Sequence, residues 1–499
     1  MQTHGRRQFA RSAVHSARQL DKVRAVAADL ENPTRLERVA AAFTRWAERT
    51  IPDAFVFALI GTVIVVVAAS VRPEVRTLDV VEIWGKGFWE LLPFTLQMAL
   101  VVITGYVLAT TRPVHRLIER LASIPKGART AVAFVAFIAM VSSWFNWGFG
   151  LMFSAMLAKE VARRVQAADY RALAASAFLG LGSVWAQGLS GSAALQMATP
   201  SALQPAIRTI IEGDGQVPHG VIPLTHTIFL WQSLVSVFVE ILVVTLVVYF
   251  AAPTGMRAKN AAALGISLDA DVAVHEEQVQ AKTKGEWLEY SPILSVLVVV
   301  LATTYLARYF WKSENGLASI TLDTINLAFL TVGIALHGTP HRLMKSVREA
   351  TPAVWGIILQ FPFYAGIAAV VSKTHLNEMI ASWFVQLSNR ETFPALTAMY
   401  SALLGVFVPS GGSKWVIEAP YVMQAAHELH VHLGWTVAVY DLGEALANLV
   451  QPFWMLPVLG LFRLRARDVM GFTFLIFLVL LPLVLILVTF LGMTLEYPL

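Results

Sequence analysis

Seven uncharged, apolar stretches of this chain are each long enough to cross a lipid bilayer as a helix. Since roughly 18 consecutive apolar residues span the hydrocarbon core, these stretches constrain the fold class more than any other feature. They are Ala54–Val71, Leu91–Thr111, Ala172–Ile207, Tyr290–Ala307, Ala350–Ser372, Ala445–Phe462 and Val469–Leu495. Of the 499 residues 56% are hydrophobic and 14% charged, and the mean hydropathy is +0.61. The sequence therefore predicts an all-α polytopic membrane protein.

Basic residues are spread between the apolar stretches, which is typical of cytoplasmic loops and not of nucleic-acid binding. Residues 1–50 hold ten Lys/Arg against five Asp/Glu and contain no apolar core of the signal-peptide type. We therefore expect an uncleaved, basic arm and a cytoplasmic N-terminus. The expected surroundings are the lipid bilayer, with no nucleic-acid partner.

Two apolar segments stop inside the predicted membrane. Residues 131–158 are interrupted by Asn146-Trp-Gly-Phe-Gly150, and residues 392–413 end in Pro-Ser-Gly-Gly-Ser. Proline removes a backbone donor and glycine permits a sharp turn. Unwound backbone at membrane depth is tolerated only where protein or water satisfies its polar groups. Each segment thus predicts a re-entrant helical hairpin with a binding site at its tip.

The two halves of the chain repeat the same order of elements. A discontinuous helix follows each hairpin, over 172–207 and 434–461, and one further span follows each broken helix. Gln97 precedes Asn146 by 49 residues, and Gln360 precedes Pro409 by 49. An additional span near 290–307 would insert the second copy with the opposite orientation. The pattern predicts two inverted repeats with about nine full spans plus two hairpins, the architecture of secondary transporters.

Five segments follow from this pattern as predicted domains. They are a basic arm (1–50), the first membrane repeat (51–250), a polar cytoplasmic linker (251–289), a connecting span (290–311) and the second, inverted repeat (312–499).

Several motifs in this order resemble the short-chain fatty acid transporter family, which includes bacterial acetoacetate and butyrate carriers. They are NWGFGL (146–151), SGS followed by ATP (190–200), LQFPFYAGI (359–367), VPSGG followed by Trp (408–415) and NLVQPFW (448–454). The resemblance runs from about Arg45 to the C-terminus. It implies the ion-transporter superfamily, a scaffold with a mobile transport domain, coupling to Na⁺ or H⁺, and a homodimer.

The matching motif positions imply a site for a small carboxylate at two hairpin tips and two helix breaks. Hydroxyls, amides and half-helix N-termini there attract an anion without holding it permanently. No firm metal site is predicted, although oxygens at the hairpin tips suit Na⁺. The predicted substrate-binding residues are Asn146, Gly148, Gly150, Ser190, Gly191, Ser192, Ser410, Gly411, Gly412, Ser413, Lys414, Asn448 and Gln451.

Charged residues within the predicted spans leave alternatives open. Lys414 and Glu418 are spaced i,i+4, so they form a structural ion pair or leave Lys414 to bind the substrate carboxylate. Asp441 and Glu444, close to the second helix break, are candidates for ion coupling. Glu240 is a further candidate, with a bundle-facing structural role as its alternative.

The function that we expect from the sequence is secondary active transport of short-chain monocarboxylates, such as acetoacetate or butyrate, across the bacterial inner membrane. The predicted mechanism is cation-coupled alternating access. The alternatives are a passive carboxylate channel and an intramembrane enzyme. Against the enzyme, the chain has no cysteine nucleophile and no H-E-x-x-H motif, and no acidic pair recurs in both halves. No cofactor is expected besides the coupling ion.

Overall fold

Within the residues that it describes, the computed structural model consists of helices joined by loops and contains no strand, as the sequence predicted. It describes residues 54–72, 76–89, 92–198, 220–268, 283–312, 322–376, 386–406 and 411–499, together with a few isolated positions. The predicted basic arm, most of the polar stretch of the linker and the tip residues 407–410 lie outside this description.

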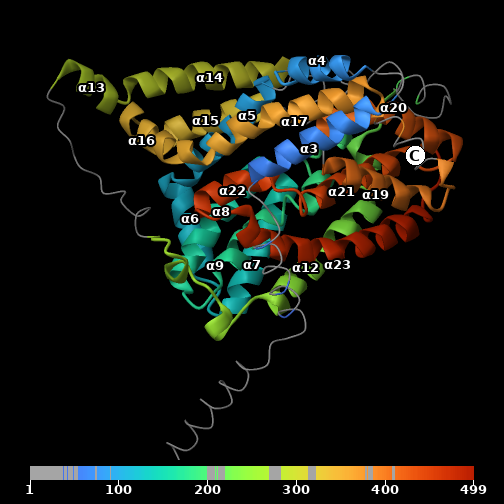
Figure 1. Ribbon diagram of the computed structural model, residues 1–499. Helices are drawn as coiled ribbons and strands as arrows, with labels where there is room; N and C mark the ends of the chain where they lie inside the picture. The colour runs from blue at the N-terminus through green and yellow to red at the C-terminus, as the bar shows by residue number, and fades with distance from the viewer. Residues whose placement is uncertain are drawn as a thin grey trace, which may run out of the picture.

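The helices form two groups, and in Figure 1 the first lies above most of the second, whose helix α20 reaches the height of α17. In the upper group α15 packs on α5 and α14, and α17 packs on α3, α4 and α5. Its members are α3 (Ala54–Ser70), α4 (Thr77–Gly87), α5 (Leu92–Ala109), α13 (Lys284–Tyr290), α14 (Ile293–Lys312), α15 (Leu322–His337), α16 (Pro340–Ala350) and α17 (Trp355–Lys373).

The lower group contains both hairpins, both broken helices and the span that follows each of them. Its members are α6 (Arg112–Ala122), α7 (Ala128–Phe145), α8 (Trp147–Arg164), α9 (Tyr170–Phe178), η1 (Val184–Gln187), α10 (Ser192–Ala198), α12 (Trp231–Ala251), α19 (Phe393–Gly405), α20 (Gly411–Glu428), α21 (Leu433–Ala447), η9 (Phe453–Met455), α22 (Leu456–Phe462) and α23 (Ala466–Gly492). Contacts of α8 with α5 and of α17 with α22 join the two groups.

Element boundaries repeat along the chain at a nearly constant distance. The first residues of α4 and α16 (77 and 340), of α5 and α17 (92 and 355) and of α9 and α21 (170 and 433) differ by 263 positions in each case. The first residues of α8 and α20 (147 and 411) and of α10 and α22 (192 and 456) differ by 264. The order of elements therefore repeats in the two halves, and the repeat includes α4 and α16, which were not predicted from the sequence.

Three of the helices were not predicted from the sequence. Two basic segments between apolar stretches fold as α6 and α16, and the third helix is α4. All three mix charged and apolar residues along 11 residues, so they lack the uncharged run that identifies a span. Amphipathic helices of this kind pack one face on neighbours and leave the charges outside.

Fewer helices than the expected nine spans have the full length and composition of a membrane crossing. Within the described residues four do: α7, α12, α14 and α23, or five if the bent pair α16 and α17 is one span. The helices α3 and α15 are slightly shorter, at 17 and 16 residues. The predicted spans 172–207 and 434–461 are broken, as expected, into α9, η1 and α10 and into α21, η9 and α22.

The second hairpin packs on the broken helix α21 more closely than its own arms pack on each other. A Cβ atom on Gly443 of α21 would lie 2.2 Å from the carbonyl oxygen of Ala398 in α19. Only glycine permits this approach, because a backbone atom cannot give way as a flexible side chain can.

We predict that Gly443→Ala lowers the stability of the protein by about 1–3 kcal/mol through overpacking. Gly85→Ala in α4 is the matched control, because a Cβ there meets nothing within 4 Å. Thermal unfolding in detergent measures both variants. Equal melting temperatures for the two variants would contradict the close packing of α19 on α21.

Candidate functional site

The first hairpin turns at a single residue between two helices of 18 residues each. Asn146 has an extended backbone, and its side-chain Oδ1 accepts a hydrogen bond of 2.9 Å from the amide of Phe149. This N-cap satisfies one of the free amides at the start of α8. Gly148 is buried in the first turn of α8. A Cβ on Gly150 would lie 2.7 Å from the amide nitrogen of Ser143, so α8 begins in close contact with the end of α7.

The tip of the first hairpin is bonded to the first helix break. Ser190 Oγ accepts a hydrogen bond of 3.1 Å from the amide of Trp147, and the amide of Leu189 donates to the carbonyl of Trp144 at 2.9 Å. Gly191 lies so close to the carbonyl oxygen of Ala186 that a Cβ would be 2.1 Å away. The glycine and serine of this break therefore serve a tight turn and a contact between elements.

The first break also contacts the start of the second hairpin's returning helix. Gln196 Nε2 in α10 donates a hydrogen bond of 3.0 Å to the carbonyl of Gly412 in α20. A Cβ on Gly412 would lie 3.3 Å from Cβ of Ser192, and one on Gly411 would lie 3.1 Å from Cγ of Glu444. Ser410 and the side chain of Ser413 are not among the described residues.

The two helix breaks contact each other directly. Asn448 Nδ2 donates a hydrogen bond of 2.9 Å to the carbonyl of Leu181, and Asn448 Oδ1 accepts one of 2.9 Å from Gln451 Nε2. Gln451 Oε1 in turn accepts from the amide of Phe453 at 2.6 Å. These side chains satisfy backbone groups that the breaks release from helical bonding, as buried backbone requires.

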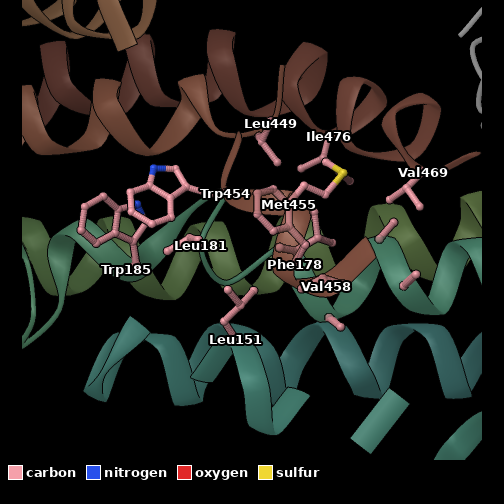
Figure 2. Packing of buried hydrophobic residues seen from close by; sticks show 14 of the residues in the cluster. Leu151, Phe178, Leu181, Trp185, Leu449, Trp454, Met455, Val458, Val469 and Ile476 are labelled. Atoms are coloured by element: carbon pink, nitrogen blue, oxygen red, sulfur yellow. The ribbon is translucent and has the colours of Figure 1, made fainter. Parts of the chain in front are cut away.

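Aromatic and aliphatic side chains fill the space between the breaks. The ring of Trp147 lies 6.3 Å from that of Trp185 and 5.2 Å from that of Trp454, both edge-on. Figure 2 shows Trp185 and Trp454 among the buried hydrophobic side chains, together with Leu181 and Leu449. One residue of the first hairpin tip thus joins both breaks. All four segments predicted from the sequence meet in one region.

Charged side chains are buried where α19, α20 and α21 meet. Lys414 Nζ lies 2.6 Å from Glu444 Oε2, with side-chain exposures of 1% and 0%. Of the two predicted alternatives, the ion pair with Glu418 is wrong: Glu418 Oε2 instead accepts a hydrogen bond of 2.9 Å from the hydroxyl of Tyr440. The reason is geometrical, because Lys414 in the first turn of α20 points across the hairpin toward α21 and not along its own helix.

Ser401, which was not predicted from the sequence, also contacts the ammonium group of Lys414. Its carbonyl and hydroxyl oxygens accept hydrogen bonds from Nζ at 2.7 and 3.1 Å. The ring of Tyr440 lies 4.9 Å from Nζ. Ser401 and Tyr440 belong to α19 and α21, and nothing in the sequence around them indicates that they meet a lysine.

The other two candidates for ion coupling are also fully buried. Asp441 Oδ2 accepts a hydrogen bond of 3.3 Å from the amide of Ala194 in α10. Glu240 in α12 accepts from Gln187 Nε2 at 2.7 Å and from Ser236 Oγ at 3.0 Å. Glu240 therefore faces the first break inside the bundle, which agrees with either of its two predicted roles.

Paired hairpins, paired broken helices and buried charges at their junction define a helical membrane protein of the transporter class. The sequence profile described as "Short chain fatty acid transporter" matches residues 35–491. A relative from Haemophilus influenzae is 35% identical over 442 residues, which cover 88% of this chain and 96% of the relative. One from Escherichia coli (strain K12) is 38% identical over 442 residues, covering 87% and 95%. Both carry the name "Putative short-chain fatty acid transporter".

This chain therefore belongs to the short-chain fatty acid transporter family and is a multi-pass membrane protein. The resemblance inferred from the five motifs is confirmed.

Two solved structures are similar at a lower level. The YdaH transporter of Alcanivorax borkumensis is 15% identical, with a TM-score of 0.42 over 88% of this chain and 97% of that one. MtrF of Neisseria gonorrhoeae, described as illuminating a class of antimetabolite efflux pumps, is 16% identical, with a TM-score of 0.41 over 91% and 99%.

We predict that breaking the buried ion pair costs more than replacing it. Lys414→Met leaves Glu444 buried without its partner and should cost about 3–5 kcal/mol, whereas Lys414→Met/Glu444→Gln should recover much of the loss. The melting temperatures of the two single variants and the double variant in detergent test this coupling.

The exposed pair of Lys86 and Glu82 in α4 is the matched control, because both side chains are more than half exposed. Lys86→Met should leave the melting temperature unchanged. A double variant at 414 and 444 that is no more stable than Lys414→Met would show that the pair is not coupled.

Proposed function

We propose that this protein is a secondary active carrier of short-chain monocarboxylates, driven by a gradient of Na⁺ or H⁺ through alternating access. Its family and the names of its relatives support the substrate class. The observation that carries the proposal is the convergence of two hairpins and two helix breaks on one buried region.

The substrate carboxylate is proposed to bind between the two hairpin tips. The helices α8 and α20 begin there, and their N-termini present backbone amides and the positive ends of their dipoles to an anion. The side chains of Asn146, Ser190, Asn448 and Gln451 already hold backbone groups in place, so their proposed role is to shape the site. Trp147, Trp185 and Trp454 are proposed to enclose the acyl chain.

Movement is assigned to the lower group of helices, which carries the whole site, against the upper group as scaffold. The two hairpins are proposed to enter the membrane from opposite sides, the N-terminus to lie in the cytoplasm, and the protein to reside in the bacterial inner membrane as a homodimer. Opposed hairpins would allow the site to open to either side in turn.

Uptake into liposomes tests the transport proposal. We expect purified protein to accumulate a labelled C2 to C6 monocarboxylate against its gradient when an inward gradient of Na⁺ or H⁺ is imposed, because coupling supplies the free energy. The control is the same liposomes with the ion gradient collapsed. Flux that only ever runs downhill would identify a passive channel instead.

Cysteine labelling tests the opposed orientation, because the chain contains no natural cysteine. His430, after the second hairpin, and Arg116, in α6, are both exposed. A membrane-impermeant thiol reagent added outside cells should label His430→Cys and spare Arg116→Cys until the cells are opened. Labelling of His430→Cys from the cytoplasmic side alone would refute the inverted repeat.

A further inference from the structure

The ammonium group of Lys414 has the surroundings of a bound metal cation. Three oxygens lie around Nζ: a carboxylate of Glu444 at 2.6 Å, and the carbonyl and hydroxyl of Ser401 at 2.7 and 3.1 Å. Carboxylate, carbonyl and hydroxyl oxygens are the ligands that hard cations take in proteins. The lysine side chain is 1% exposed, so bulk water does not replace them.

The elements around this group are arranged to favour positive charge. Ser401 lies near the C-terminal end of α19, where helix carbonyls carry partial negative charge. The hydroxyl of Ser401 donates its proton to the carbonyl of Tyr440 at 2.7 Å, so its lone pairs remain for Nζ. The face of the Tyr440 ring, 4.9 Å from Nζ, also attracts a cation.

Carboxyl groups outnumber ammonium groups in this cluster. Glu418, Asp441 and Glu444 are at most 2% exposed, and each interacts electrostatically with Lys414. Asp441 Oδ1 and Glu444 Oε1 are buried without a hydrogen-bond partner among the described residues. Burying unpaired charge is expensive, so an ionised carboxylate in this cluster needs a cation beside it.

The first hairpin has no such side chain at the matching position of its returning helix. Lys414 is the fourth residue of α20, and the fourth residue of α8 is Gly150. Gly150 lets α8 pack directly against Ser143, whereas Lys414 reaches from α20 to both α19 and α21. A tethered positive charge at this position is therefore specific to the second hairpin.

We propose that Lys414 is a built-in cation, which fills at the second hairpin the site that a free alkali cation would otherwise occupy. Transport by the wild-type protein then needs no Na⁺ at this site. The proposal rests on the proposed carrier function, and it leaves H⁺ as the coupling ion.

The test compares uptake of a short-chain carboxylate into proteoliposomes in Na⁺ and in choline medium under the same H⁺ gradient. Wild type and the exposed-site control Lys86→Ala should transport equally in both media. Lys414→Ala, which empties the site, should be slow in choline and should gain at least about fivefold in Na⁺, the lower end of typical coupling between two sites.

Stability gives a second measurement if Lys414→Ala does not transport. A cation that binds only the folded protein raises its melting temperature. Na⁺ should therefore raise the melting temperature of Lys414→Ala above its value in choline, leave that of wild type unchanged, and lose its effect in Lys414→Ala/Glu444→Gln.

Wild-type uptake that requires Na⁺ would overturn the built-in cation while leaving the carrier function intact. A Lys414→Ala protein whose uptake and melting temperature both ignore Na⁺ would overturn it too. Absence of wild-type uptake under every gradient would instead refute the proposed function.

Discussion

The ion pair of Lys414 and Glu444 is the interaction on which the second hairpin depends. It joins α20 to α21, and the bonds from Lys414 to Ser401 add α19. Buried charges contribute little net stability, since their desolvation offsets much of their attraction. Their removal one at a time is costly, however, so such a pair fixes which surfaces meet. In this protein the pair sets where the hairpin lies on the broken helix, and therefore the shape of the region between the tips.

The two halves satisfy the free backbone groups of their broken helices with different side chains. A broken helix inside a membrane protein exposes backbone groups that lipid cannot satisfy. The first half uses a serine hydroxyl and an asparagine cap, together with glycines that bring backbone segments into contact. The second half uses Asn448, Gln451 and the charged cluster. The doubled element order thus carries different side chains at the tips and breaks of its two halves.

The positions of the hairpins and breaks were predictable because their signals are local. Asn146, Asn448 and the glycines interrupt long apolar runs, and an interruption of that kind reports on the nearby backbone. The helices α4, α6 and α16 were not predicted because they contain charged residues, and only long uncharged runs were interpreted as spans. Contacts between residues far apart in the chain could not be predicted from local sequence patterns. Lys414 pairs with a residue 30 positions away, and Asn448 donates to a backbone carbonyl 267 positions away. The i,i+4 rule favoured Glu418 because it considers one helix alone.

We propose that the two hairpin tips and two breaks enclose one carboxylate site. An experimental structure with a bound short-chain monocarboxylate, determined without Na⁺, tests this proposal most directly. We expect density for the carboxylate between the starts of α8 and α20, with Lys414 still paired to Glu444. A substrate bound in the upper group of helices, away from both tips, would contradict it.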